Sequence, residues 1–259
     1  MILITHCHYD HLGGISQFLP DWIISIIASA AGKEFITSDL STHGLFDLVG
    51  KPTPGFKVTK WAQSLERLTW PCIGGEGRID LGLVMVPAAG HTPDSMAWYD
   101  CEEMHLYVGD SMYEEGSDGM PIVFPKEGNL VEYVFQMHKL QYLIRGENGR
   151  AAAAAAKKLE EEGFVSVPRR VKLGAGHQTH SVDAEEFFER VGELWWKTLR
   201  GEVPVVRKKV FRGEEVWTWR EEDGKSGVSL RAPRRLMDDA RAFFKGSDVL
   251  EERRAGSWL

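Results

Sequence analysis

Short apolar or alternating runs, separated by Gly, Pro and Asp, predict a series of β-strands in the first half of the chain. The expected strands cover residues 1–4, 34–37, 56–61, 66–70, 78–86, 95–99 and 105–108. Residues 15–31 are interpreted as a helix broken at Pro20, and residues 41–49 as a short helix capped by Ser41 or Thr42. The apolar run at 22–32 is far shorter than the ~20 residues that a membrane span needs, so we expect a core helix there.

Helical patterns become longer in the second half of the chain. Residues 129–163 predict a helix in two segments, broken near 146–149, and residues 183–200 predict another, with a strand at 171–173 between them. Later residues predict strands at 203–211, 215–220 and 227–231 and a helix at 233–244. Because about sixty residues struggle to fold alone, we expect a main domain at 1–200 and a C-terminal extension at 201–259 packed on it.

One segment directly after the first apolar run concentrates potential metal ligands. Its sequence, THCHYDHLGG, contains His6, His8, Asp10 and His11. His6 and His8 are two residues apart, so an extended backbone points both imidazoles to one side. Clustered His and Asp side chains at this spacing are typical of metal sites. The sequence therefore predicts a metal-binding loop that could feed two neighbouring ions.

Three later motifs repeat one arrangement, in which a His or an Asp follows a glycine at the end of an apolar stretch. They are Gly90-His91, Gly109-Asp110 and Gly176-His177. A glycine at such a position lets the backbone turn sharply and come close to a site.

In this order, the four motifs resemble those of the metallo-β-lactamase superfamily, and the resemblance covers residues 1 to about 200. It implies an α+β, four-layer αβ/βα sandwich that holds metals at one edge of two facing sheets. It also implies a ligand set for two zinc ions: His6, His8 and His91 for the first, Asp10, His11 and His177 for the second, and Asp110 as the bridge between them.

The position of the metal-binding loop departs from that family. Members normally carry several strands and an early Asp ahead of the loop, whereas here the loop begins at residue 6. We therefore expect the N-terminal part of the first sheet to be missing, through truncation or replacement by another element. The innermost strand would then expose an edge through which copies of the chain could associate.

Composition narrows the choice of partners and compartment. The chain has 259 residues, 43% of them hydrophobic, and a formal net charge of −7. This charge argues against a nucleic-acid partner, because such proteins carry basic patches that neutralise phosphates. The three cysteines are too few for a disulfide framework, and neither a signal peptide nor a membrane span is visible. We expect a cytoplasmic enzyme with a small-molecule substrate.

The ligand set predicts hydrolysis of a lactone or another ester. Two zinc ions lower the pKa of a bridging water towards neutrality, which yields a hydroxide nucleophile at pH 7. Asp10 and Tyr113 are the candidate catalytic residues. Tyr113 stands three residues after Asp110, as a Tyr does in the acyl-homoserine lactonases, and could donate to the oxyanion or the leaving oxygen. Simple packing of Tyr113 is the alternative.

Two other functions remain open. One is a mononuclear Fe²⁺ oxidoreductase of the sulfur-dioxygenase type, which would use His6, His91 and Asp110 as a facial triad. The other is a metal-binding relict without turnover. The Gly-Cys-Gly-Arg type of sequence that glyoxalase II relatives carry after the bridging Asp is absent at residues 114–119, which argues against a glutathione thioester substrate.

Overall fold

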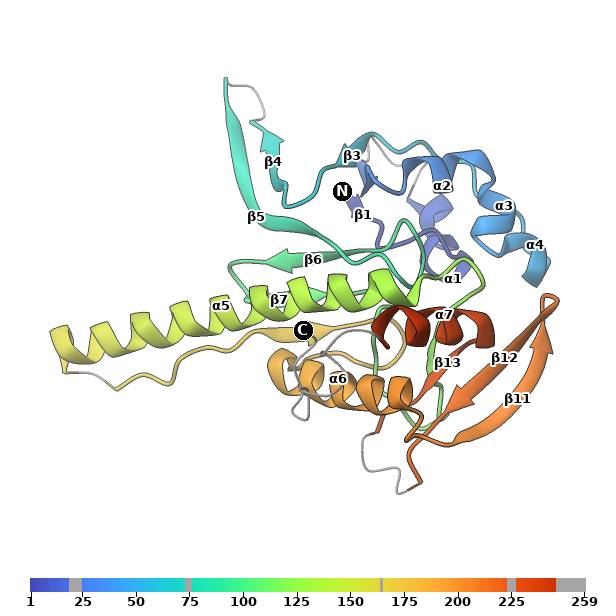
Figure 1. The fold of residues 1–259 in the computed structure, drawn as a ribbon. Helices are drawn as coiled ribbons and strands as arrows, with labels where there is room; N and C mark the ends of the chain where they lie inside the picture. Colours follow the sequence, from blue (N-terminus) through green and yellow to red (C-terminus); the bar gives the residue numbers. More distant parts are fainter. Residues whose placement is uncertain (19–24, 73–75, 164, 223–226, 246–259) are drawn as a thin grey trace.

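The computed structural model describes residues 1–18, 25–72, 76–163, 165–222 and 227–245, which form three sheets and the helices around them (Figure 1). The strands are β1 (Ile2–Leu3), β2 (Ile26–Ser29), β3 (Lys60–Ala62), β4 (Arg67–Pro71), β5 (Arg78–Pro87), β6 (Met96–Asp100), β7 (His105–Tyr107), β8 (Ile122–Val123), β9 (Lys172–Gly174), β10 (Val182–Asp183), β11 (Val205–Phe211), β12 (Glu214–Trp219) and β13 (Leu230–Pro233). The helices are α1 (Tyr9–Leu12), the 3-10 turn η1 (Ile15–Gln17), α2 (Lys33–Ser38), α3 (Leu40–His43), α4 (Phe46–Val49), α5 (Leu130–Glu162), α6 (Ala184–Arg200) and α7 (Arg234–Phe244).

The N-terminal sheet has the parallel order β1-β2-β3. All four residues of β2 are buried, as expected for a strand covered on both faces. The expected helix at 15–31 is therefore wrong at Ile26–Ser29; residues 19–24 of that prediction lie outside the described residues. Strand β1 lies at the edge of this sheet, and self-association through that edge stays a prediction.

Two further assignments near the N-terminus are corrected. Residues 34–37, expected to be a strand, belong to helix α2. Residues 41–49 form two short helices, α3 and α4, rather than one, and the Asp39 side chain caps α3 by accepting from the Thr42 N–H at 3.1 Å. Asp39 is preferred to Ser41 or Thr42 because it directly precedes the first helical residue.

The central sheet has six strands in the order β10-β9-β7-β6-β5-β4. Strand β6 is antiparallel to both β5 and β7, and β9 is parallel to β7. Strands β5, β7 and β9 therefore run in the same direction, and their carboxyl ends meet at one edge of the sheet. This edge is where the three glycine-led motifs are located.

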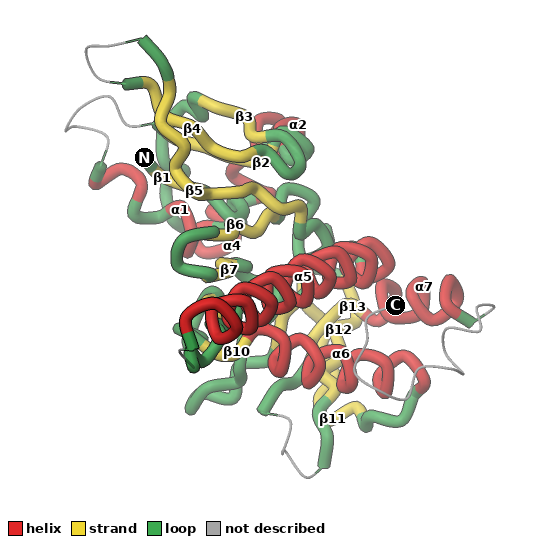
Figure 2. Tube along the Cα trace, turned by 90° about the vertical axis from the view of Figure 1, so that its left-hand side faces the viewer, coloured by secondary structure: helices red, strands yellow, loops and turns green. Residues whose placement is uncertain are grey.

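The C-terminal sheet has the order β11-β12-β13-β8, and β8 comes from the middle of the chain. Helices α5, α6 and α7 contact one another, and α7 also contacts β12 and β13 (Figure 2). Trp195, Trp196 and Trp219 are buried in the largest hydrophobic cluster, as expected of core residues. The division into a domain at 1–200 and an extension at 201–259 stays a prediction.

Helix α5 is continuous from Leu130 to Glu162, so the expected break near residues 146–149 does not occur. Asn129 caps its N-terminus by accepting from the Glu132 N–H, and Gly163 ends it in the left-handed conformation, with φ of +66°. In the part of the chain that the structure describes, neither α5 nor any other helix is both long and apolar enough to cross a membrane.

Candidate metal centre

Backbone hydrogen bonds hold the metal-binding loop between the sheets. The Thr5 carbonyl accepts from the Met96 N–H at the start of β6, at 2.9 Å, and the Tyr9 N–H donates to the Gly44 carbonyl at 2.8 Å. The loop is therefore anchored to the central sheet on one side and to the turn after α3 on the other. These contacts bring the ligands that follow β1 to the sheet edge where β5, β7 and β9 end.

Three imidazoles converge at this edge. His6 Nε2 lies 3.0 Å from His8 Nδ1, which lies 3.1 Å from His91 Nε2. Ring nitrogens that share one tetrahedral zinc would be about 3.3 Å apart, so the three groups are close to the spacing of a common metal. Burial is the largest cause that lowers the pKa of His6, His8 and His91, which favours the neutral form that binds metal.

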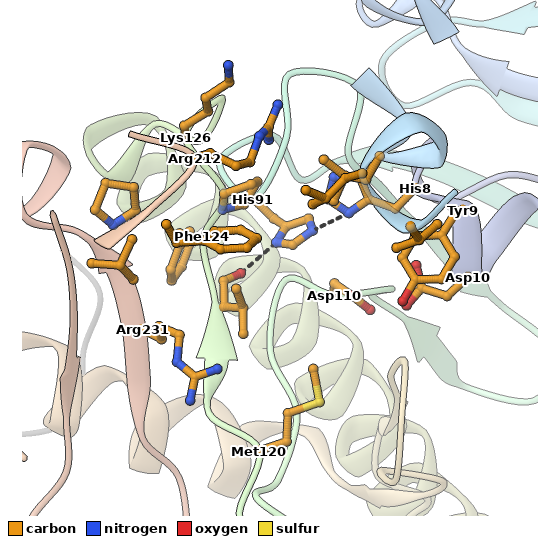
Figure 3. Close-up of a pocket in the computed structure, with 18 of the residues that line it drawn as sticks. His8, Tyr9, Asp10, His91, Asp110, Met120, Phe124, Lys126, Arg212 and Arg231 are labelled. Atoms are coloured by element: carbon orange, nitrogen blue, oxygen red, sulfur yellow. Dashed lines mark hydrogen bonds between the residues drawn. The ribbon is translucent and has the colours of Figure 1, made fainter. Parts of the chain in front are cut away.

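A second contact sets the orientation of His91. Its Nδ1 donates to the backbone carbonyl of Val123 at 2.7 Å, which leaves Nε2 free to face His8 (Figure 3). A hydrogen bond of this kind fixes both the tautomer and the ring plane of a metal-binding histidine. The geometry of the three rings therefore fits a metal ligand set.

Asp110 joins the two histidines of the second group. His11 Nε2 lies 3.0 Å from Asp110 Oδ1, and His177 Nε2 lies 3.2 Å from Asp110 Oδ2. Burial alone would raise the pKa of Asp110, but the hydrogen bonds from His11 and His177 hold it well below its usual range. The carboxylate can therefore use one oxygen on each side, as a bridge between two ions must.

The ligating atoms fall into overlapping groups, each within 4.8 Å. These groups are His6, His8 and His91; His6, His11 and Asp110; and Asp10, Asp110 and His177. All seven residues that the sequence singled out as metal ligands are thus brought together, although His11 lies with His6 and Asp110 rather than with Asp10. Their assignment to individual ions stays a prediction.

Unusual backbone conformations and one glycine allow the ligands to come this close to one another. A Cβ built on Gly176 would overlap Asp110 Oδ1, so no other residue fits there without movement. Gly109, just before Asp110, has φ of +54°, and His177 has φ of +63°. The left-handed region is uncommon for a residue with a side chain and is often occupied at functional sites.

Tyr113 lies beside the second group of ligands. Its ring centroid is 4.7 Å from that of His177, and its hydroxyl donates to the Pro121 carbonyl at 2.8 Å and accepts from the Val123 N–H at 3.1 Å. Burial raises the pKa of the phenol, so it stays protonated. A catalytic role for Tyr113 stays a prediction, and it would require the hydroxyl to exchange Pro121 for substrate.

A cavity of about 330 Å³ opens onto these ligands, with His8, Asp10, His91, Asp110 and His177 in its wall. Its other walls contain residues that the sequence did not single out: apolar Leu48 and Phe124, and the cations Lys126, Lys209, Arg212 and Arg231. Lys209 falls in a predicted strand, but a basic residue on a strand does not by itself indicate a cavity wall.

A family model described as the metallo-beta-lactamase superfamily matches residues 2–195. Because this match covers well over half of the chain, the chain belongs to the metallo-β-lactamase superfamily. The predicted fold class, an α+β sandwich of the metallo-β-lactamase type, is confirmed.

Two curated relatives match part of the chain. It is 28% identical over 118 residues to a probable metallo-hydrolase, YqgX, of Bacillus subtilis strain 168, covering 44% of this chain and 50% of that protein. It is 26% identical over 143 residues to a putative transcription factor, avaE, of Aspergillus versicolor, covering 55% of this chain and 40% of that protein. The aligned part therefore spans half or less of each of these relatives.

Solved structures of low sequence identity also match. An archaeal metallo-beta-lactamase superfamily protein from Sulfolobus tokodaii is 16% identical with a TM-score of 0.49, covering 81% of this chain and 70% of that chain. The BLEG-1 B3 metallo-beta-lactamase is 19% identical with a TM-score of 0.49, covering 72% and 73%. TTHA1623, solved in a di-iron-bound form, is 17% identical with a TM-score of 0.47, covering 70% and 71%.

Proposed function

We propose that this chain is a metal-dependent hydrolase that cleaves an ester or lactone bond of a small molecule. One observation carries the proposal: seven side chains with metal-ligating atoms converge at one sheet edge, and five of them line a cavity of about 330 Å³. A volume of this size is at the lower end of small-ligand sites. The relative described as a probable metallo-hydrolase supports hydrolysis as the reaction class.

The chain's residues would hold two divalent ions, which we propose are zinc. His6, His8 and His91 would hold one ion, Asp10, His11 and His177 the other, and Asp110 would lie between them. Such ions, when bound, polarise a carbonyl group and lower the pKa of water. Imidazole and carboxylate ligands suit zinc and also iron, so the donor set by itself permits either metal.

The protein would orient the ligands and provide an apolar surface for the substrate. Val123 holds the His91 ring in place through its carbonyl, and Gly176 leaves room for the Asp110 carboxylate. Phe124 and Leu48 provide apolar walls against which the hydrocarbon part of an ester can pack. Tyr113 is the proposed donor to the leaving oxygen, and Asp10, at the exposed end of the cluster, lies where substrate would enter.

The seven-residue cluster supports a dinuclear hydrolase over a mononuclear iron oxidoreductase. A facial triad of His6, His91 and Asp110 would leave the other four candidate ligands without a role. The His91–Val123 contact, whose effect is to orient Nε2, supports metal binding by the chain, and turnover is what distinguishes the hydrolase from a metal-binding relict.

Metal analysis of the purified chain, combined with turnover of phenyl acetate and a γ-lactone, tests the proposal. We expect about two zinc ions per chain and hydrolysis that is lost on chelation and regained with zinc. One iron per chain with oxygen consumption would replace the proposal with the oxidoreductase, and absence of both metal and turnover would leave the relict.

A further inference from the structure

We propose that the substrate carries an anionic group, a carboxylate or a phosphate, and that Lys209 and Arg231 bind this group on the cavity wall formed by the C-terminal sheet. This inference rests on the proposed function, because it names the class of substrate for the same cavity. The two cations come from β11 and β13, outside the 2–195 range of the family match.

The register of the C-terminal sheet directs both cations into the cavity. Lys209 is paired with Val216, which is paired with Pro233, and all three line the cavity. One step along the same face, Arg231 is paired with Val123, and both again line the cavity. Because side chains alternate between the faces of a sheet, this face forms one wall of the cavity.

The opposite face of the sheet packs on the core. Trp219, Leu230 and Ala232 are buried in the largest hydrophobic cluster, whereas Arg231, between the last two, lines the cavity. In Figure 3, Arg231 lies across the cavity from Asp10 and Asp110. The metal ligands and the cations therefore occupy different walls of one space.

Within the described part of the chain, these two cations lack an acidic partner. Among the residues that the structure describes, Arg231 donates to the Thr218 hydroxyl at 3.2 Å and Lys209 lies over the Phe211 ring at 4.8 Å, but neither side chain forms an ion pair. Both are only partly exposed. Burial and nearby positive charge lower the pKa of Lys209 and Arg231 from their ordinary values, with Arg207 close to both.

The other two cations of the cavity are different. Arg212 forms an ion pair with Glu127 at 2.9 Å, and Lys126 lies 3.9 Å from the same carboxylate. Glu127 therefore offers a carboxylate to both cations at that end of the cavity, whereas Lys209 and Arg231 have none within ion-pair distance among the described residues, in a chain with a net charge of −7. An anionic ligand would relieve the repulsion and gain charge-assisted hydrogen bonds.

The residues between the metal ligands and the two cations indicate what the rest of the substrate is like. Phe124 and Val123 line the cavity between the metal ligands and Arg231, with the Phe124 ring 6.5 Å from that of His91. An apolar body, such as an aromatic ring, would pack there while its anionic substituent reaches the sheet. The substrate class is therefore an ester or lactone whose apolar body carries an acid group distant from the scissile bond.

Matched esters test this inference. The probes are phenyl acetate, 4-acetoxybenzoate and 4-acetoxyphenyl phosphate, and the proteins are the wild type, Lys209→Met, Arg231→Met and Arg231→Lys. The control is Lys208→Met, because Lys208 stacks on Trp217 at 4.3 Å on the opposite face of β11. Thermal unfolding of each variant verifies that it folds.

We expect wild type to favour one of the anionic esters over phenyl acetate in kcat/KM by about tenfold or more, since hydrogen bonds to charged groups are worth about one to two powers of ten in binding. Arg231→Met and Lys209→Met should remove this preference through KM, Arg231→Lys should restore part of it, and Lys208→Met should retain it. Which ester shows the effect distinguishes a carboxylate from a phosphate.

Calorimetric binding of benzoate and phenyl phosphate to the same proteins separates this inference from the proposed function. Binding that weakens about tenfold in Arg231→Met but not in Lys208→Met supports the inference even if no ester is hydrolysed. Equal turnover of charged and neutral esters, or anion binding that Arg231→Met and Lys209→Met both leave unchanged because metal ions hold the anion, would overturn it while leaving hydrolysis intact.

Discussion

The backbone carbonyl of Val123 accepts the Nδ1 hydrogen of His91 at 2.7 Å, and Val123 is also the residue of β8 that pairs with Arg231. One short strand therefore connects a candidate metal ligand to the cavity wall that carries Lys209 and Arg231, which we call the cationic wall. Tyr113 reinforces this strand, because its hydroxyl accepts from the Val123 N–H. A change in the position of β8 should consequently alter both the metal centre and the cationic wall.

Removal of one imidazole should separate the candidate ligands from other histidines. We expect His8→Ala to weaken metal binding at least about 100-fold and to abolish hydrolysis, because loss of a mere supporting contact already costs up to that factor. The control is His43→Ala, since His43 donates to the Phe35 carbonyl at 2.6 Å and lies outside the cluster. Metal titration followed by emission spectrometry provides the measurement, and equal loss in both variants would contradict the ligand assignment.

A methyl group on Gly176 should act specifically on Asp110. Because the added Cβ would overlap Asp110 Oδ1, we expect Gly176→Ala to displace the carboxylate, lower the metal content and reduce kcat by about 10²-fold, a typical result of misplacement by about 1 Å. The matched control is Gly149→Ala in α5, where a Cβ meets nothing within 4 Å. That change should stabilise the helix by about 1 kcal/mol. Normal metal content in Gly176→Ala would show that the cluster adapts.

Loss of the Tyr113 hydroxyl tests its proposed role as a donor. We expect Tyr113→Phe to lower kcat on a lactone on the order of 10²-fold while both metal ions stay bound. Steady-state kinetics together with metal analysis provide the test. Unchanged kcat with a stability loss of about 1 kcal/mol would mean that the hydroxyl only holds Pro121 and Val123 in place.

The buried carboxyl of Asp94 should impose a pH dependence on folding. Asp94 is 1% exposed, and burial raises its pKa to about 6 from an ordinary 3.8. The folded state then binds the proton more tightly than the unfolded state, so this group lowers the free energy of unfolding as pH rises from about 4 through 6. We expect the free energy of unfolding of Asp94→Asn to be higher than that of the wild type by about 3 kcal/mol at pH 8 and by about half of that at pH 5.

Urea unfolding of the two proteins at both pH values measures this difference. Other titrating groups contribute equally to both proteins and cancel. A difference that does not depend on pH would show that the Asp94 carboxyl is not protonated preferentially in the folded state.

The candidate metal centre could be predicted from sequence because its ligands come in short motifs with strong local geometry. His6 and His8 are two residues apart on extended chain, and Gly90, Gly109 and Gly176 each precede a ligand at a strand end. The common direction of β5, β7 and β9 then brings the three later ligands together, since these strands end at one edge of the sheet. Neither step requires knowledge of distant packing.

The errors lie where an apolar run does not specify its own secondary structure. Residues 26–28 are apolar and, with Ser29, form the parallel strand β2, because pairing with β1 and β3 decides between strand and helix. Residues 34–37 contain aromatic and β-branched side chains, which favour strands, but belong to helix α2. In both cases tertiary neighbours override the local pattern.

The cationic wall escaped sequence analysis for a different reason. Lys209 and Arg231 lie on separate strands whose pairing runs through Thr218 and Val216 of β12. Only this pairing and the attachment of β13 to β8 bring the two cations to the same cavity. A single basic residue on a predicted surface strand cannot be told from a solvated one without that register.

Because β13 joins the cavity through β8, the candidate metal ligands and most of the cations that face them come from different parts of the sequence. The candidate ligands come from residues 6–177, whereas most of the opposing cations come from residues 209–231. Exchange of the β11–β12 hairpin could therefore alter which molecules are accepted without touching the reactive centre. In laboratory evolution, substitutions confined to that hairpin should change substrate selectivity while the metal ligands stay the same.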